Sequence, residues 1–227
     1  MHEGLFKQSG IRNLTMTGNS EKLPRRERER LQHKDEILSA ALKLFSEKGF
    51  HNVSMQEIAT EAEFATGTLY NFFPSKEALF DELADGCAER IISSLNVALE
   101  KPGNEVEKLR TFIRYQPQMI EENADFIRLY VSEVGVRGTK LSQRSDKQKV
   151  DAVLNVRLSK LLKAGIDKGI FRCVDPDIAT QALTSLLETI GLDLGSNFDM
   201  AQATEIFAKV EELFLDGLLM TEGKNNE

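Results

Sequence analysis

Residues 54–76, SMQEIATEAEFATGTLYNFFPSK, decide the fold of this chain. Ser54 and Glu57 have the spacing of a capping box, in which each side chain satisfies a free backbone amide near the other residue. Apolar residues then recur on one helical face, which predicts a short helix with a single buried side. These residues are Met55, Ile58, Ala59 and Ala62.

A break at residues 63–65 separates this helix from a second one. Leu69 and Phe73 are spaced to face the same core, and Pro74 ends the helix because a residue before proline is excluded from the α region. Ser75 is then placed to cap the next helix. The outer face of the second helix carries small or hydrogen-bonding residues, namely Thr66, Gly67, Thr68, Tyr70 and Asn71. Two short helices joined in this way form a helix-turn-helix plan.

A third helix precedes the motif, and Gly49 is placed to end it. Its apolar positions are Ile37, Ala41, Leu44 and Phe45. The stretch from Ile37 to Phe80, with LF..KGF, the IA pair and GTLY..F.SKE.L, resembles the N-terminal DNA-binding domain of the TetR (tetracycline-repressor-like) family. Beyond Phe80 the resemblance is one of length and helicity only.

The resemblance implies that the second helix of the motif enters the major groove of DNA. The threonines would face base edges or phosphates, Gly67 would allow close approach of the backbone, and Tyr70 and Lys76 would bind phosphate. The implied contact residues in this segment are Ser54, Gln56, Ala65, Thr66, Gly67, Thr68, Tyr70, Asn71 and Lys76. The alternative is that several of these residues are simply exposed helix residues.

Two residues depart from the family pattern. Glu63 stands where the turn usually has glycine, and Ala65 stands where the recognition helix usually has a serine or threonine cap. Loss of such a cap costs about 1 kcal/mol, so one alternative is that Thr66 caps the helix instead. Glu63 also places a negative charge near the expected DNA surface.

Residues 1–23 show no periodicity and predict a flexible tail, and both Met1 and Met16 are candidate start residues. The charged segment PRRERERLQHKDE then leads into the domain at residues 24–80. Two interpretations are open for Arg25, Arg26 and Arg28: a solvated helix end, or an arm that reaches phosphates or a minor groove. The net charge of residues 1–30 is +3, within a chain of net charge −7.

Composition excludes several classes of protein. With 41% hydrophobic and 29% charged residues, the 227-residue chain has no apolar run of the roughly 18–20 residues that a membrane helix needs. The start, MHEGLFKQSG, lacks the core of a signal peptide, so a cytoplasmic protein is expected. Cys87 and Cys173 do not have metal-site spacing, and no cofactor, metal site or catalytic motif is predicted. The chain is therefore not expected to be an enzyme or to bind membranes.

The remainder of the chain has only helical periodicity, which predicts an all-α fold with a larger helical domain at residues 81–222 and a short tail at 223–227. A long linking helix is predicted from Lys76 to Leu99. Further helices are predicted at residues 104–115, 117–122, 124–136 and 150–169, with a polar loop at 137–148.

The last two helices have wide apolar stripes, and Asp175-Pro176 marks the start of the first of them. In the family that the chain resembles, these helices pair with their twofold mates, which implies a homodimer. The implied interface residues are Ile178, Ala182, Leu186, Ile190, Phe207, Val210, Phe214 and Leu218. The alternative is that these residues form the core of the chain itself.

The family's second domain usually binds a small molecule, which implies a pocket among the middle helices. Candidates are the apolar and aromatic residues Cys87, Phe112, Tyr115, Met119, Phe126 and Tyr130, with Arg114 and Arg128 nearby. Aromatic residues at helical spacing are also typical of a core.

Together these features predict a homodimeric transcriptional repressor that binds a palindromic double-stranded DNA operator and is released by a small-molecule inducer. The alternative is a helix-turn-helix protein-interaction module without sequence-specific DNA binding, which the acidic balance and residues Glu63 and Ala65 favour.

Overall fold

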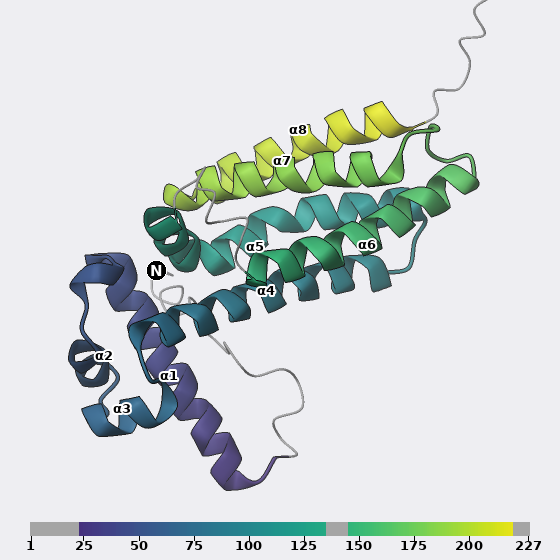
Figure 1. The fold of residues 1–227 in the computed structure, drawn as a ribbon. Helices are drawn as coiled ribbons and strands as arrows, with labels where there is room; N and C mark the ends of the chain where they lie inside the picture. The colour runs from purple at the N-terminus through teal and green to yellow at the C-terminus, as the bar shows by residue number, and fades with distance from the viewer. Residues whose placement is uncertain (1–22, 135–144, 220–227) are drawn as a thin grey trace, which may run out of the picture. The chain divides into compact units, whose positions relative to one another are not determined.

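The computed structural model describes residues 23–134 and 145–219, and every regular element in these ranges is a helix (Figure 1). The sheet-like pairing within them is an isolated bridge between Phe171 and Leu219. The all-α fold is thus confirmed. None of the described helices is both long and apolar enough to cross a bilayer. Residues 1–22 of the predicted N-terminal tail, the predicted C-terminal tail at 223–227 and residues 137–144 of the predicted loop lie outside the described residues. The prediction of a loop is wrong at residues 145–148, which are helical.

The described residues form two compact units. The first contains residues 23–87 and 122–134, and the second contains residues 88–121 and 145–219. Helices α4 (Lys76–Glu100) and α5 (Glu105–Val134) therefore contribute to both units. The sequence predicts a domain boundary at residue 80, which would assign the end of α5 to the second domain. In the structure, this segment packs within the first unit.

The first unit is built on α1 (Arg25–Lys48), the 3-10 turn η2 (Phe50–Asn52), α2 (Met55–Glu61) and α3 (Thr66–Phe72). Gly49 ends α1 with a φ of 81°, a conformation that glycine adopts without strain. The core joins the three helices of the motif with the start of α4. Its most deeply buried members are Ile37, Ala41, Phe45, Ile58, Leu69, Leu79 and Leu83.

The turn between α2 and α3 is a Schellman motif formed without glycine. The Phe64 amide donates to the Ala59 carbonyl at 2.8 Å, and the Glu63 amide donates to the Thr60 carbonyl at 3.1 Å. Glu63 has a φ of 60°, the left-handed conformation that the motif requires. The family's usual glycine at this position is explained by that geometry, and Glu63 adopts it at a cost of about 1 kcal/mol.

The predicted helix boundaries in the motif are confirmed. Ser54 and Glu57 form the complete capping box, and α3 ends before Pro74. Ser75 caps α4, because its hydroxyl accepts a hydrogen bond from the Ala78 amide at 3.3 Å. Ala65 is the N-cap of α3 and supplies no side-chain hydrogen bond, so the alternative start with Thr66 as the cap is not adopted.

The end of α5 joins the first unit through an aromatic cluster on α4. The Phe80 ring lies 5.9 Å from the Phe126 ring and stacks on Tyr130 at 6.4 Å, with 11° between the ring planes. His51 of η2 also meets Glu133, with 3.1 Å between Nε2 and Oε2. These contacts explain why the end of α5 belongs with the helix-turn-helix.

The prediction of three helices between residues 104 and 136 is wrong, because α5 is one helix that passes through Pro117. Proline removes one helical hydrogen bond and usually marks a break in a helix. Here Pro117 is buried, and the neighbouring Gln116 side chain donates to the Phe112 carbonyl at 3.0 Å. Tertiary packing therefore overrides the local signal.

The second unit contains the second part of α4, the first part of α5, and the helices α6 (Ser145–Asp167), α7 (Pro176–Ser196) and α8 (Met200–Leu218). Asp175 caps α7, as predicted. Between α6 and α7, Phe171 packs on Gly165, where an added Cβ would lie 2.1 Å from the ring. The Arg172 amide donates to the Leu218 carbonyl at 2.7 Å, which fastens the end of α8 to this connection.

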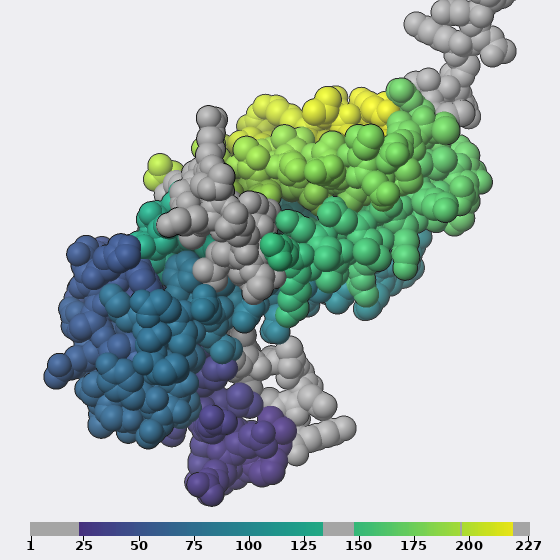
Figure 2. Space-filling view, in the orientation of Figure 1, coloured from purple at the N-terminus to yellow at the C-terminus, as the bar shows by residue number. Residues whose placement is uncertain are grey.

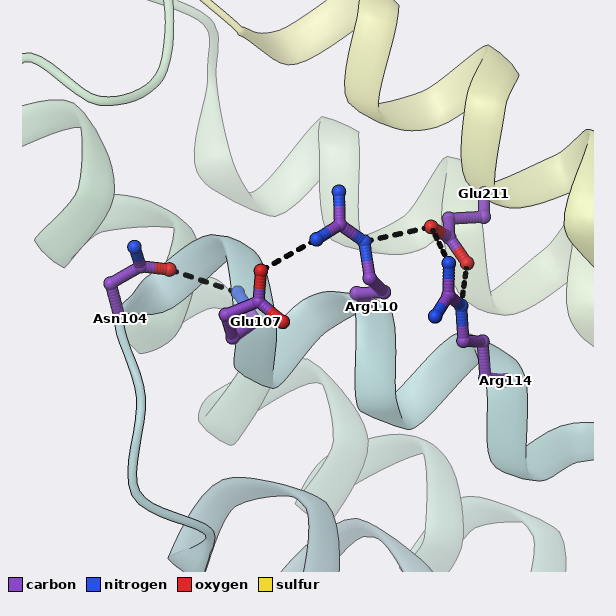
Figure 3. A network of polar contacts seen from close by, with 5 residues as sticks. All are labelled: Asn104, Glu107, Arg110, Arg114 and Glu211. Carbon is purple, nitrogen blue, oxygen red and sulfur yellow. Dashed lines mark hydrogen bonds and ion pairs between the residues drawn. The ribbon is translucent and has the colours of Figure 1, made fainter.

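A charged network attaches α8 to α5 within the second unit (Figure 3). The Glu211 carboxylate accepts hydrogen bonds from Arg110 Nε at 2.8 Å and from Arg114 Nε at 2.5 Å and Nη2 at 3.0 Å. Arg110 also pairs with Glu107 at 2.5 Å. The Glu211 side chain is only 9% exposed, so its charge is stabilised mainly by the two guanidinium groups.

Replacing Glu211 should therefore destabilise the protein. We expect Glu211→Gln to lower the free energy of unfolding by about 1–3 kcal/mol, because two arginines lose their shared carboxylate while Arg114 keeps access to water. Urea unfolding at fixed protein concentration measures this change. The matched control is Glu205→Gln, which removes an exposed pair with Lys209 and should leave the value essentially unchanged, because solvent screens that pair. Equal losses in both variants would contradict the role of the network.

At the Glu63 turn we expect a substitution to increase stability. Glu63→Gly should raise the free energy of unfolding by about 0.5–1 kcal/mol, because glycine adopts positive φ without the penalty of a Cβ. Glu63→Ala removes the same charge but keeps the Cβ, so it should give no such gain. Thermal unfolding of both variants separates backbone strain from charge, and equal stabilisation by both would show that charge is responsible.

Candidate nucleic-acid interface

The outer face of α3 exposes the polar groups that the sequence assigns to DNA. Tyr70 is 51% exposed, Asn71 and Gly67 are exposed, and Thr66 and Thr68 are half-buried. Leu69, the inward residue of the same helix, is fully buried. The helix is therefore fixed by one face and presents the opposite face to solvent.

The polar side chains of this face have no hydrogen-bond partners within residues 23–134 and 145–219. Thr66 and Thr68 lie in the first turn of α3, where no helical carbonyl stands four residues behind them. Threonines deeper in other helices, such as Thr60 and Thr204, donate to such carbonyls instead. The α3 hydroxyls and the Asn71 amide thus remain available to a ligand outside the chain.

At the start of α2, the Ser54 hydroxyl already has hydrogen-bond partners within the chain. The Ser54 hydroxyl accepts the Glu57 amide at 3.2 Å and donates to the Glu57 carboxylate at 2.9 Å, so its proton is already engaged. Gln56 is exposed and its side chain has no partner in the described chain. Hydrogen bonds from the Ser54 amide, Lys48 and the Ser54 hydroxyl lower the pKa of Glu57 to about 2. Glu57 is therefore ionised at neutral pH.

Two lysines of α1 offset the acidic residues of α2. Lys48 pairs with Glu57 at 3.0 Å, and Lys43 pairs with Glu61 at 2.6 Å. The hydrogen bond that Lys43 donates to the Glu61 carboxylate raises the pKa of Lys43. These pairs reduce the net repulsion that α2 would exert on DNA, whereas Glu63 stays exposed and has no such partner in the described residues.

Lys76 is half-buried, and its ammonium group is already in use. Nζ donates to the Phe50 carbonyl at 2.9 Å and lies 4.8 Å from the centre of the Phe50 ring. This arrangement connects α4 to η2. A phosphate contact from Lys76 remains a prediction, and the sequence held no signal for its contact with Phe50.

The arginines at the start of α1 lie on a helix rather than on an irregular arm. Arg25 pairs with Glu29 at 2.7 Å, and its side chain is 86% exposed. Arg26 and Arg28 are exposed on the same turns. Of the two interpretations given above, the structure shows the helix end, and a DNA contact from these arginines remains a prediction.

The six predicted pocket residues are divided between the two units. Cys87, Phe126 and Tyr130 lie in the first unit, where the last two pack on Phe80. Phe112, Tyr115 and Met119 lie in the second unit. Arg114 binds Glu211 and Arg128 pairs with Asp125, so both nearby arginines have partners in the chain.

The predicted interface residues of α7 and α8 also separate into two groups. Phe207, Val210 and Leu218 are buried within the single chain, so packing of the chain itself accounts for them. Ile178 is 68% exposed and Ala182 is exposed, while Leu186, Ile190 and Phe214 are half-buried. Leu213, which is not among the predicted interface residues given above, is also 68% exposed.

Comparison with known proteins supports the resemblance along most of the chain. Residues 37–83 match the family described as bacterial regulatory proteins, tetR family. Residues 106–189 match the tetracyclin repressor-like C-terminal domain. The two matches together cover more than half of the 227 residues.

Individual relatives agree with these matches. The chain is 32% identical to the HTH-type transcriptional regulator YuxN of Bacillus subtilis over 139 residues, which are 53% of this chain but only 44% of YuxN. It is 27% identical to the HTH-type transcriptional repressor KstR2 of Mycobacterium tuberculosis over 145 residues, or 63% of this chain and 70% of KstR2.

The fold is also similar to solved structures. The TetR family transcriptional regulator PfmR from Thermus thermophilus superposes with a TM-score of 0.64 at 27% identity, over 83% of this chain and 98% of that one. Both family matches, the curated relatives and this structure point to one assignment. The chain belongs to the TetR family of bacterial transcriptional regulators.

Proposed function

We propose that this protein is a DNA-binding transcriptional regulator that acts as a homodimeric repressor on a palindromic operator and is released by a small-molecule inducer. The observation that carries the proposal is the outer face of α3, where a rigid helix presents polar groups without partners in the described chain. Such a face fits the donor and acceptor pattern of a major groove. The family assignment supports the same function.

Gly67 is the residue on this face that packing within the chain explains least. A Cβ built at Gly67 meets no atom within 4 Å, and the residue has no positive φ that would require glycine. Glycine in a helix is less favourable than alanine by roughly 0.5–1 kcal/mol. Close approach of DNA to the α3 backbone at this point would explain why glycine rather than alanine stands here.

A homodimer is supported by the exposed surfaces of α7 and α8. Ile178 and Leu213 are each 68% exposed, and Gly217 lies in open space in the last turn of α8. Along α7, the exposed positions between Ile178 and Thr189 carry no charge. Glu188 in this stretch is half-buried, and on α8 the exposed Glu212 and Asp216 border Leu213, so the large exposed aliphatic side chains lie beside a few charges. Exposed aliphatic side chains of this size are suited to contact with a second copy.

Release by a small molecule is supported by the matched C-terminal domain and by the continuity of α4. This helix has its first residues in the unit that reads DNA and its last residues in the second unit. A ligand that binds better to a state with displaced α4 would shift the protein toward that state. The chemical class of the inducer stays open.

The variant Gly67→Ala tests this function. We expect it to keep or slightly raise stability, by roughly 0.5 kcal/mol, because alanine favours a helix and the added methyl has free space. It should nevertheless weaken operator binding by about tenfold or more, since loss of one close contact amounts to about 1–3 kcal/mol. Thermal unfolding and fluorescence anisotropy with an operator duplex measure the two effects.

The matched control is Asn155→Ala at an exposed position of α6, which should give a similar gain in stability and leave DNA binding unchanged. Unchanged DNA affinity in Gly67→Ala would contradict the proposed position of α3. Failure of the wild-type protein to enrich any sequence from a random duplex library at low salt would instead favour the protein-interaction module that exposed Glu63 suggests.

A further inference from the structure

The first turns of α1 extend beyond the core of the helix-turn-helix unit. Ile37 is the first buried residue of α1, so residues 25–36 precede all core contacts of this helix. At about 1.5 Å per residue, this extension is roughly 18 Å long. It projects beyond the surface of α2 and α3 in the space-filling view, where it is coloured purple (Figure 2). An exposed helix end of this length is not maintained by apolar burial.

One face of the extension contacts α3 and the turn before it. The Arg30 guanidinium carbon lies 5.9 Å from the centre of the Phe72 ring. The His33 ring meets Phe64 at 5.1 Å and Phe72 at 6.5 Å, edge to face in both cases. Arg30 and His33 continue the helical spacing of Ile37, so they lie on the face of α1 that packs on the motif.

Arg30 lies on an aromatic ring without a carboxylate partner, which distinguishes it from Arg25 and Lys34, although the Lys34 ammonium group also lies 5.9 Å from the centre of the Phe73 ring. Lys34 pairs with Glu82 at 2.7 Å, and Arg25 pairs with Glu29 at 2.7 Å. Within the described ranges, no carboxylate pairs with Arg30, and its side chain contacts the Phe72 ring instead. A guanidinium group that rests on an aromatic ring keeps its N–H groups free for an anion. Arg30 is thus oriented by the recognition helix itself.

We infer that Arg30, held against Phe72, binds a backbone phosphate of the operator beside the groove that α3 enters, and that Phe72 is a positioning residue for this contact. The inference rests on the proposed function. The fork of a guanidinium matches a phosphate, and contacts to the backbone fix the register of a protein on DNA. Phe72 therefore links the two helices, because it belongs to α3 and its ring orients Arg30 of α1.

Salt dependence tests the phosphate contact. Wild-type protein and variants are titrated at several salt concentrations with a duplex that the wild-type protein selects from a random library. Arg30→Gln should reduce the magnitude of the slope of log affinity against log salt by about 0.9 for each protein copy bound, or about 1.8 for a dimer on one duplex, because each copy loses one phosphate contact. Arg157→Gln, which removes an exposed arginine of α6, should leave the slope unchanged. Arg30→Lys should keep the slope, because the charge remains, but should weaken binding because a lysine cannot stack in the same way.

Coupling between Phe72 and Arg30 tests the positioning role. Phe72→Leu keeps an apolar side chain at this half-buried position but removes the ring. It should weaken binding, and combining it with Arg30→Gln should cause no loss beyond that of Arg30→Gln alone. Circular dichroism shows whether Phe72→Leu folds. If this variant does not fold, Arg30→Lys tests the same loss of stacking by changing a side chain that is exposed to solvent.

The possible outcomes distinguish a failure of this inference from a failure of the proposed function. If Arg30→Gln leaves both affinity and slope unchanged while Gly67→Ala weakens binding, the phosphate contact is wrong and the DNA-binding function stands. Fully additive losses from Phe72→Leu and Arg30→Gln would overturn the positioning role alone. If the wild-type protein selects no duplex, the function and the inference both fail.

Discussion

Burial of the inner face of α3 is the constraint on which the arrangement of its exposed polar face depends. Leu69 is fully buried and Phe73 is 3% exposed, so the rotation of this short helix about its axis is fixed. A seven-residue helix is not stable alone, and its order comes from the core that it shares with α1 and α4. Fixing the inner face simultaneously fixes which groups face outward. The geometry of Gly67, Tyr70 and Asn71 is thus a consequence of apolar packing.

Electrostatics accommodates DNA in a chain with a net charge of −7. This total is misleading because the charges are unevenly distributed: Glu57 and Glu61 of α2 are neutralised locally by lysines of α1. Arg30, in contrast, has an aromatic partner in place of a carboxylate and keeps its full charge. Attraction to DNA therefore depends on where unpaired charges lie, and net charge alone is a poor guide.

Local signals predicted the helix-turn-helix well, because its boundaries are set by neighbouring residues. The capping box at Ser54, the stop before Pro74 and the start at Asp175-Pro176 each involve groups a few positions apart. The prediction was wrong where tertiary packing decides: α5 passes through Pro117 because the surrounding helices bury that turn. Hydrophobic periodicity also marks Phe207 as buried without telling whether its own chain or a second copy covers it. Contacts between distant residues, such as Arg110 with Glu211, need the fold itself.

In the proposed function, two copies of the chain place their α3 helices together on one DNA site. Analytical ultracentrifugation of the full chain with a fluorescent duplex selected from a random library, combined with footprinting, tests it most directly. We expect an even number of protein copies per duplex and a protected inverted repeat whose half-sites are about one helical turn, or a multiple of it, apart. A single copy bound to a site without a repeat, or protection of no sequence at low salt, would show that the chain does not act as a dimer on a palindromic operator.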